Sequence, residues 1–152
     1  MFDPTVQQPG QPVKQFSLML NNRTGALASI LQLLESRGIY CIGISVQDCQ
    51  EVAITRLILT DPEQAITLFL ERGIGFTWSE MTVISLPSGS QGLNACVDAL
   101  CRTDINIDFL YPLIPCCRGY SRIALHLSDP SLAHSVLNKA GIIVLYQEDL
   151  SR

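Results

Sequence analysis

The first patterned part of the chain shows a strand period followed by a helix period. Over residues 15–21, apolar side chains recur at every second position, which predicts a strand with one buried face. Over residues 26–37 they recur at i, i+3, i+4 and i+7, so we expect a helix that ends at Gly38. A strand, a turn and a helix therefore open the patterned sequence.

Two more strands, a second helix and a fourth strand follow. Residues 39–48 and 52–60 are rich in β-branched and apolar side chains and are separated by a short polar turn, which predicts a strand pair. Asp61 then provides a helix cap with Pro62 directly behind it, and Gly73 ends that helix. With a strand expected over 76–80, the element order is β-α-β-β-α-β.

The second half of the chain repeats this order. Thr60-Asp61-Pro62, ten residues and Gly73-Ile74 recur as Ser128-Asp129-Pro130, ten residues and Gly141-Ile142. We expect strands at 82–86, 105–114, 120–128 and 142–147, a loop at 87–92, and helices after 92 and 129. The predicted fold class is therefore α+β. Two tandem ferredoxin-like units should each form an antiparallel four-stranded sheet with both helices on one face.

Unit boundaries follow from the same pattern. Residues 1–14 are polar and lack the basic start and apolar run of a signal peptide, so we expect a loose N-terminal arm. The first unit should span 15–80 and the second 81–152. Because no Gly-, Pro- or Ser-rich linker separates them, we expect one rigid body joined by a continuous or sharply bent strand.

Composition favours a cytoplasmic protein that pairs with another copy of itself. The chain is 47% hydrophobic and only 16% charged, so we expect part of its apolar surface to form a homodimer interface. A net charge of −4 argues against nucleic acid, and no apolar run is long enough to span a membrane. The six cysteines contain no C-x-x-C pair, which favours reduced thiols and no metal or other cofactor. The adjacent pair Cys116-Cys117 leaves a redox role open.

Candidate catalytic residues are few, and the sequence predicts that the protein is not an enzyme. His126 and His134 have no Cys, Ser or Asp partner nearby in the sequence. Asp61 and Asp129 are explained as helix caps, and the acidic tail at 148–149 is expected to be a solvated end.

The loop before the first helix carries the most informative motif. It reads Asn21-Asn22-Arg23-Thr24-Gly25-Ala26-Leu27. This N-R-x-G-x-L pattern, followed by an apolar helix and present in a duplicated chain, resembles the ACT domain family and its tandem-ACT regulatory proteins over residues 15–148. Backbone N–H groups near Gly25 and Ala26 suit a carboxylate, the amide of Asn22 suits both charged groups of a free amino acid, and Gly25 permits close approach.

The resemblance also implies that the second residue of the following strand reaches a ligand held by a neighbouring unit. That residue is Tyr40 in the first unit and Asn106 in the second. The structural alternatives are a packing role for Tyr40, an exposed strand amide at Asn106, and ordinary turn roles for Asn22 and Gly25.

The second loop differs from the first. Its candidate ligand residues are Ser88, Gly89, Gln91 and Gly92, with Ser88 in place of the first unit's amide. Neither loop has the full set, so one paired site could combine Asn22 with Asn106. The resemblance implies a regulatory protein that senses a free amino acid between units. The alternative is a ligand-free interaction module that docks to a biosynthetic enzyme.

Overall fold

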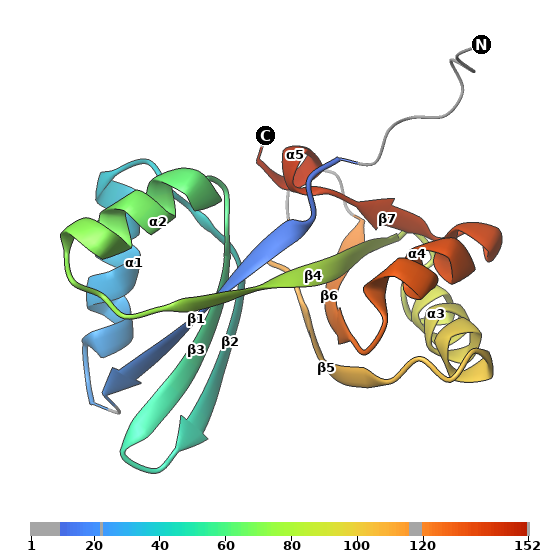
Figure 1. Cartoon of the computed structure of the whole chain (residues 1–152), viewed down its shortest axis with the longest axis horizontal. Helices are drawn as coiled ribbons and strands as arrows, with labels where there is room; N and C mark the ends of the chain where they lie inside the picture. Colours follow the sequence, from blue (N-terminus) through green and yellow to red (C-terminus); the bar gives the residue numbers. More distant parts are fainter. Residues whose placement is uncertain (1–9, 22, 116–119, 152) are drawn as a thin grey trace.

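The computed structural model describes residues 10–21, 23–115 and 120–151, and it contains two α+β units joined side to side (Figure 1). The first unit comprises β1 (Val13–Asn21), α1 (Ala26–Ser36), β2 (Cys41–Cys49), β3 (Val52–Leu59) and α2 (Pro62–Glu71). The long strand β4 (Thr77–Leu86) leads into the second unit. That unit comprises α3 (Ser90–Arg102), β5 (Ile107–Pro112), β6 (Ser121–Leu127), α4 (Pro130–Lys139), β7 (Ile143–Leu145) and α5 (Gln147–Leu150).

Strand β4 belongs to both units. Its first half pairs antiparallel with β1, from Thr77 opposite Ser17 to Met81 opposite Val13. Its second half pairs with β6 on one side and β7 on the other. The described strands therefore follow the order β2-β3-β1-β4-β6-β5, with β7 also on β4. This shared strand confirms the expected continuous connection and explains why the sequence has no linker.

The helices lie on the outer faces of the two sheet halves, α1 and α2 on one side and α3 and α4 on the other (Figure 1). Alternate residues of β1 point to opposite faces, so Phe16 and Leu18 pack with the helices of the first unit. The inner faces share a third core drawn from both units: Val13, Ile58, Met81, Val83, Tyr111, Leu113, Ala124 and Leu150. The units are therefore packed with their helix-free faces together.

The edges of the two sheet halves also touch. Gly43 of β2 forms an isolated antiparallel bridge with Leu113, and the Ile114 amide donates to the Ile42 carbonyl at 2.9 Å. A side chain at Gly43 would place its Cβ 2.6 Å from Leu113 Cδ2, so glycine permits this contact. This bridge is a second connection between the two units, formed by residues that are distant in sequence from β4.

The predicted helix caps are confirmed, whereas several boundaries are wrong. Asp61 and Asp129 accept hydrogen bonds from the amides of Gln64 and Leu132, both at 3.1 Å. The expected arm at 1–14 is too long, because β1 already begins at Val13; residues 1–9 lie outside the described part. The expected loop at 87–92 is too long as well, because α3 begins at Ser90.

The predicted end of the last strand is also wrong. The strand predicted to run to 147 stops at Leu145, and α5 follows it. The acidic side chains Glu148 and Asp149 are exposed, as the sequence predicts, but they lie on this helix. Asp149 accepts a hydrogen bond from the Tyr146 amide at 2.8 Å, and Leu150 is buried in the shared core. Capping and apolar burial therefore turn the end of the chain into a helix. No helix in the described ranges is long and apolar enough to cross a membrane.

Candidate functional site

The first candidate site is the turn between β1 and α1. The Arg23 amide donates to the Asn21 carbonyl at 2.8 Å, which tightens the turn directly after β1. Gly25 has a φ of +90° and forms the N-cap of α1, so the turn uses a left-handed conformation that glycine adopts without strain. The Ser29 amide and hydroxyl both donate to the Gly25 carbonyl, at 3.0 and 2.9 Å, and fix that conformation.

The start of α1 lacks a side-chain cap among the described residues. Helices α2 and α4 differ in this respect, because Asp61 and Asp129 occupy their first-turn amides. The first amides of a helix have no partner within the helix and carry its positive dipole end. The open start of α1 is therefore chemically suited to an anionic group such as a carboxylate.

A hollow of about 250 Å³ lies beside this uncapped helix start. Its described lining residues are Met19, Leu20, Asn21, Arg23, Ala26, Ser29 and Ile30. It brings together a guanidinium, a hydroxyl and apolar surface. Of the loop residues predicted to bind ligand, Asn21, Arg23 and Ala26 line it, Gly25 caps the helix, Thr24 is exposed and Leu27 is half-buried. Asn22 lies outside the described residues.

The second loop also starts its helix at a glycine without a side-chain cap, but the loop residues are placed differently. Gly89, with a φ of +61°, is the N-cap of α3, and its carbonyl accepts from the Leu93 amide at 3.1 Å. Gly89 therefore takes the capping place that Gly25 holds in the first unit. Gly92 lies inside α3, where a Cβ would sit 3.1 Å from Leu86 Cδ2, so its lack of a side chain serves packing. Ser88 and Gln91 are exposed beside it.

Tyr40 and Asn106 occupy equivalent positions in the two units, directly before β2 and β5 rather than within them. The Tyr40 carbonyl accepts a hydrogen bond from the Thr60 amide, and the Tyr40 amide donates to the Thr60 hydroxyl, both at 3.0 Å. Asn106 makes the same pair with Ser128, whose hydroxyl accepts the Asn106 amide at 2.9 Å. Both side chains are exposed.

Tyr40 and the first loop lie at opposite ends of their sheet. Asn21 pairs with Val52 at one end of β3, whereas Tyr40 bonds to Thr60 just past the other end. Eight residues of extended chain span about 26 Å. A ligand in the first loop therefore cannot also contact Tyr40 of the same unit. A site that includes both the loop and a residue at the Tyr40 position must take them from two different units.

A polar group near Asn106 was missed by the sequence analysis. Its side-chain amide donates to Asp108 at 2.8 Å, and the other Asp108 oxygen lies 2.8 Å from His126 Nδ1. The hydrogen bond with His126, followed by that with Asn106, lowers the pKa of Asp108. His126 also stacks on Phe109, and Arg56 of the first unit lies over the same ring at 4.2 Å.

His126, which has no Cys, Ser or Asp partner nearby in the sequence, thus has an acidic partner in the fold. Asp108 lies 18 residues away in the sequence, and only the pairing of β5 with β6 brings the two side chains together. Among the described residues, no group of three or more His, Cys, Asp or Glu side chains is arranged to hold a metal ion. Cys116 and Cys117 lie outside those residues.

Comparisons with known proteins agree with this architecture. The sequence model of a family described as an ACT domain pair matches residues 11–123. Protein BT0572 from Bacteroides thetaiotaomicron has a similar structure with a TM-score of 0.84 at 20% identity, covering 93% of this chain and 97% of that one.

Two regulatory subunits of aspartate kinase share the fold. The ligand-free subunit from Thermus thermophilus has a TM-score of 0.60 at 15% identity, covering 86% of this chain and 93% of its own. The subunit from Thermus flavus has a TM-score of 0.55 at 18% identity, covering 86% and 92%. No curated protein sequence matches this chain.

Proposed function

Because the chain belongs to the ACT domain pair family, we propose that it is a regulatory protein that senses a free amino acid at the first loop. The observation that carries the proposal is the uncapped start of α1 beside the hollow at Asn21 and Arg23. The ligand carboxylate would bind the first-turn amides and Arg23, and its ammonium would face the amide of Asn22.

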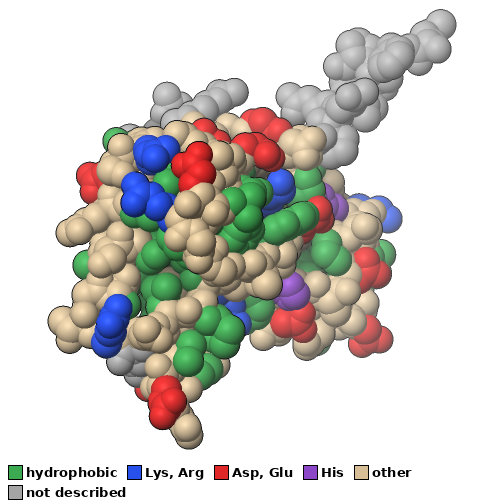
Figure 2. Space-filling view, turned by 60° about the vertical axis from the view of Figure 1, so that its left-hand side comes forward, with side chains coloured by type: hydrophobic (Ala, Val, Ile, Leu, Met, Phe, Trp, Pro, Cys, Tyr) green, Lys and Arg blue, Asp and Glu red, His purple; other side chains and the backbone are tan. Residues whose placement is uncertain are grey.

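Homodimerisation completes the proposed site. Tyr40 lies too far from the loop of its own unit, so the ligand contact that the family resemblance implies needs a different unit. Large apolar side chains are available for such an interface, among them Met19 at 72% and Tyr40 at 57% exposure. Figure 2 shows apolar side chains exposed between charged ones on one face of the molecule. Four free thiols among the described residues favour the cytoplasm as its compartment.

A thermal-shift panel of the common amino acids tests this function. A ligand at about 100 times its Kd stabilises the folded state by about 2.7 kcal/mol, which gives a clear shift in Tm. Arg23→Gln and Asn22→Ala should each reduce the shift, whereas Arg72→Gln removes an equal charge outside the hollow and should retain it. A panel without any shift, or equal loss in all three variants, would contradict amino-acid sensing.

The second candidate function is a ligand-free module that docks to a biosynthetic enzyme. It is favoured by the second loop, where α3 starts at Ser90 and Gly92 is used for packing. Two structural neighbours are named as regulatory subunits of aspartate kinase, which supports a role beside an enzyme. Co-purification with a biosynthetic enzyme, combined with no amino-acid response, would select this function over the first.

A further inference from the structure

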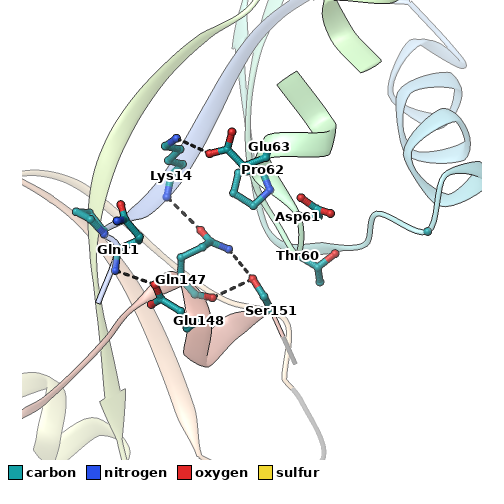
Figure 3. Close-up of a pocket in the computed structure, with 11 residues that line it drawn as sticks. Gln11, Lys14, Thr60, Asp61, Pro62, Glu63, Gln147, Glu148 and Ser151 are labelled. Carbon is teal, nitrogen blue, oxygen red and sulfur yellow. Dashed lines mark hydrogen bonds and ion pairs between the residues drawn. The ribbon is translucent and has the colours of Figure 1, made fainter. Parts of the chain in front are cut away.

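A cavity of about 500 Å³ lies where the two units meet at the start of β1 (Figure 3). Its volume falls within the range of about 300–1,000 Å³ that small-molecule sites occupy. The first unit supplies the start of β1, the connection before β2, the connection before α2 and the first turn of α2. The second unit supplies α5 and the residue that follows it. The described lining residues are Gln11, Pro12, Lys14, Gly38, Thr60, Asp61, Pro62, Glu63, Gln147, Glu148 and Ser151.

This cavity is separate from the hollow at the first loop. The two share no lining residue. Thr60 lies beyond the end of β3 that is remote from Asn21. The junction cavity therefore cannot be an extension of the proposed amino-acid site.

The wall between the units is held by Gln147, which is only 8% exposed. Its side-chain oxygen accepts from the Lys14 amide at 3.3 Å, and its nitrogen donates to the Leu59 carbonyl and the Ser151 hydroxyl, both at 3.1 Å. Because both ends of this amide are engaged, the cavity has a fixed wall. The ligand would have to be recognised by the charged side chains around it.

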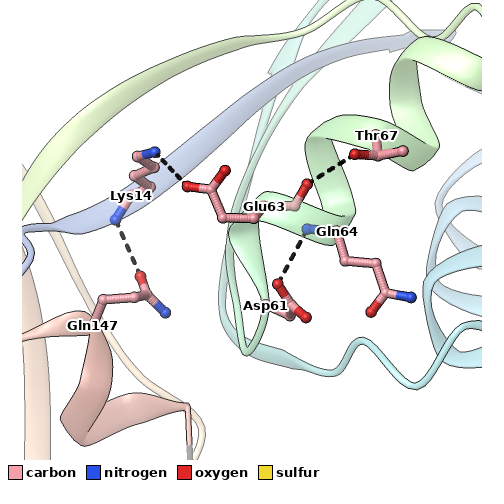
Figure 4. Close-up of polar contacts among 6 residues, drawn as sticks. All are labelled: Lys14, Asp61, Glu63, Gln64, Thr67 and Gln147. Atoms are coloured by element: carbon pink, nitrogen blue, oxygen red, sulfur yellow. Dashed lines mark hydrogen bonds and ion pairs between the residues drawn. The ribbon is translucent and has the colours of Figure 1, made fainter.

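The charges on the lining do not balance. Lys14 Nζ lies 3.3 Å from a Glu63 oxygen (Figure 4). It also lies 4.9 Å from the centre of the Trp78 ring, so the lysine among the lining residues already has partners. Asp61 on the first unit and Glu148 on the second accept backbone hydrogen bonds, from Gln64 and Gln11 respectively. No cationic side chain of the described residues pairs with either of them. Two negative charges thus remain, one on each side of the junction.

We propose that the junction cavity binds a small organic dication with two amino groups, such as a linear diamine. One ammonium donates to Asp61, with the Thr60 hydroxyl beside it, and the other approaches Glu148 on the second unit. Both charges of the ligand are then matched by carboxylates, and its carbon chain lies against Pro12 and Pro62. A ligand held by both units favours the arrangement in which those walls meet, so binding would also couple the units.

Isothermal titration of the full chain with putrescine tests this site. Putrescine has no carboxylate, so it lacks the group on which the proposed amino-acid site depends. Butanediol, which has a similar shape but no charge, is the control for shape. Sodium chloride at matched ionic strength is the control for non-specific electrostatic effects. We expect saturable one-to-one binding of putrescine and no binding of butanediol.

The duplicated helix cap supplies a matched pair of variants. Asp61→Asn removes the charge but keeps a side-chain oxygen that can cap α2, and Asp129→Asn makes the same change on α4 outside the cavity. Asp61→Asn should weaken putrescine binding about tenfold or more, because a charge-assisted hydrogen bond is lost. Asp129→Asn should bind like the wild type.

Three results would overturn the proposal. They are no saturable putrescine binding, binding that Asp61→Asn leaves unchanged, and equal weakening by the two cap variants. Each variant's unfolding transition shows whether it is folded. Failure here leaves amino-acid sensing untouched, because that function is tested with a different ligand class and with Arg23→Gln.

Discussion

The hydroxyl of Tyr111 donates a hydrogen bond to Gln15 Oε1 at 2.6 Å, across 96 residues of chain and between the two units. Both side chains are buried, and the other end of the Gln15 amide donates to Ser79 at 3.2 Å. Burial raises the pKa of the Tyr111 hydroxyl well above its ordinary value, so the group remains a neutral donor. This hydrogen bond is therefore a specific polar link within the apolar core between the two units.

Tyr111→Phe should destabilise the protein by about 1–3 kcal/mol. The substitution leaves Gln15 Oε1 buried without its partner, and an unsatisfied buried acceptor costs about that much free energy. The free energy of unfolding can be measured by denaturant titration. Tyr120→Phe is the control, because Tyr120 is 58% exposed and should change stability by less than about 0.5 kcal/mol. Equal losses in the two variants would contradict this role for Tyr111.

Gly43→Ala should also destabilise the fold, by about 1–3 kcal/mol, because its Cβ would meet Leu113 and Ile58 at 2.6 and 3.3 Å. Thermal or chemical unfolding measures the loss. Gly75→Ala is the matched control, since Gly75 has no atom within 4 Å of an added Cβ. If Gly43→Ala were as stable as Gly75→Ala, the edges of β2 and β5 would not be in close contact in solution.

Gln147→Leu should loosen the attachment of α5 to the first unit. The substitution retains the size of the side chain but removes its bonds to Lys14 and Leu59. We expect a loss of about 1–3 kcal/mol in unfolding free energy and faster hydrogen exchange at the Lys14 amide. Gln32→Leu makes the same chemical change at an exposed position of α1 and should leave that exchange rate unaltered. Unaltered exchange in Gln147→Leu would show that α5 is held by apolar contacts alone.

Local signals made most of the fold predictable from the sequence. The Asp61 and Asp129 caps act on amides three residues away, so the sequence alone locates the starts of α2 and α4. Strand and helix periods likewise report which face of each element is buried. The C-terminal helix was missed because its stability depends on Leu150 packing into a core formed by both units, which no local pattern encodes.

The candidate site was only partly predictable for the same reason. The loop motif led to Asn21 and Arg23, which lie together because they are close in the sequence. The placement of Tyr40 at the other end of the sheet follows from strand pairing, and the partnership of Asp108 with His126 follows from the register of β5 and β6. The junction cavity depends on how the two units pack, so its residues carry no shared sequence signal.

Stability should decrease on acidification through His134. This half-buried side chain lies against the Tyr146 ring, at 5.8 Å between ring centres, and burial lowers its pKa below the ordinary value of 6.5. As the pH falls through 6.5, the unfolded chain binds the proton first, so the folded state loses stability until the pH is below the folded-state pKa. Unfolding free energies measured between about pH 8 and pH 5 should therefore decline less in His134→Gln than in the wild type. His126→Gln is the control. It retains His134, so the His134 contribution to the decline in unfolding free energy should remain. An identical pH profile for His134→Gln and the wild type would mean that His134 is hydrated in solution, which would contradict its packing against Tyr146.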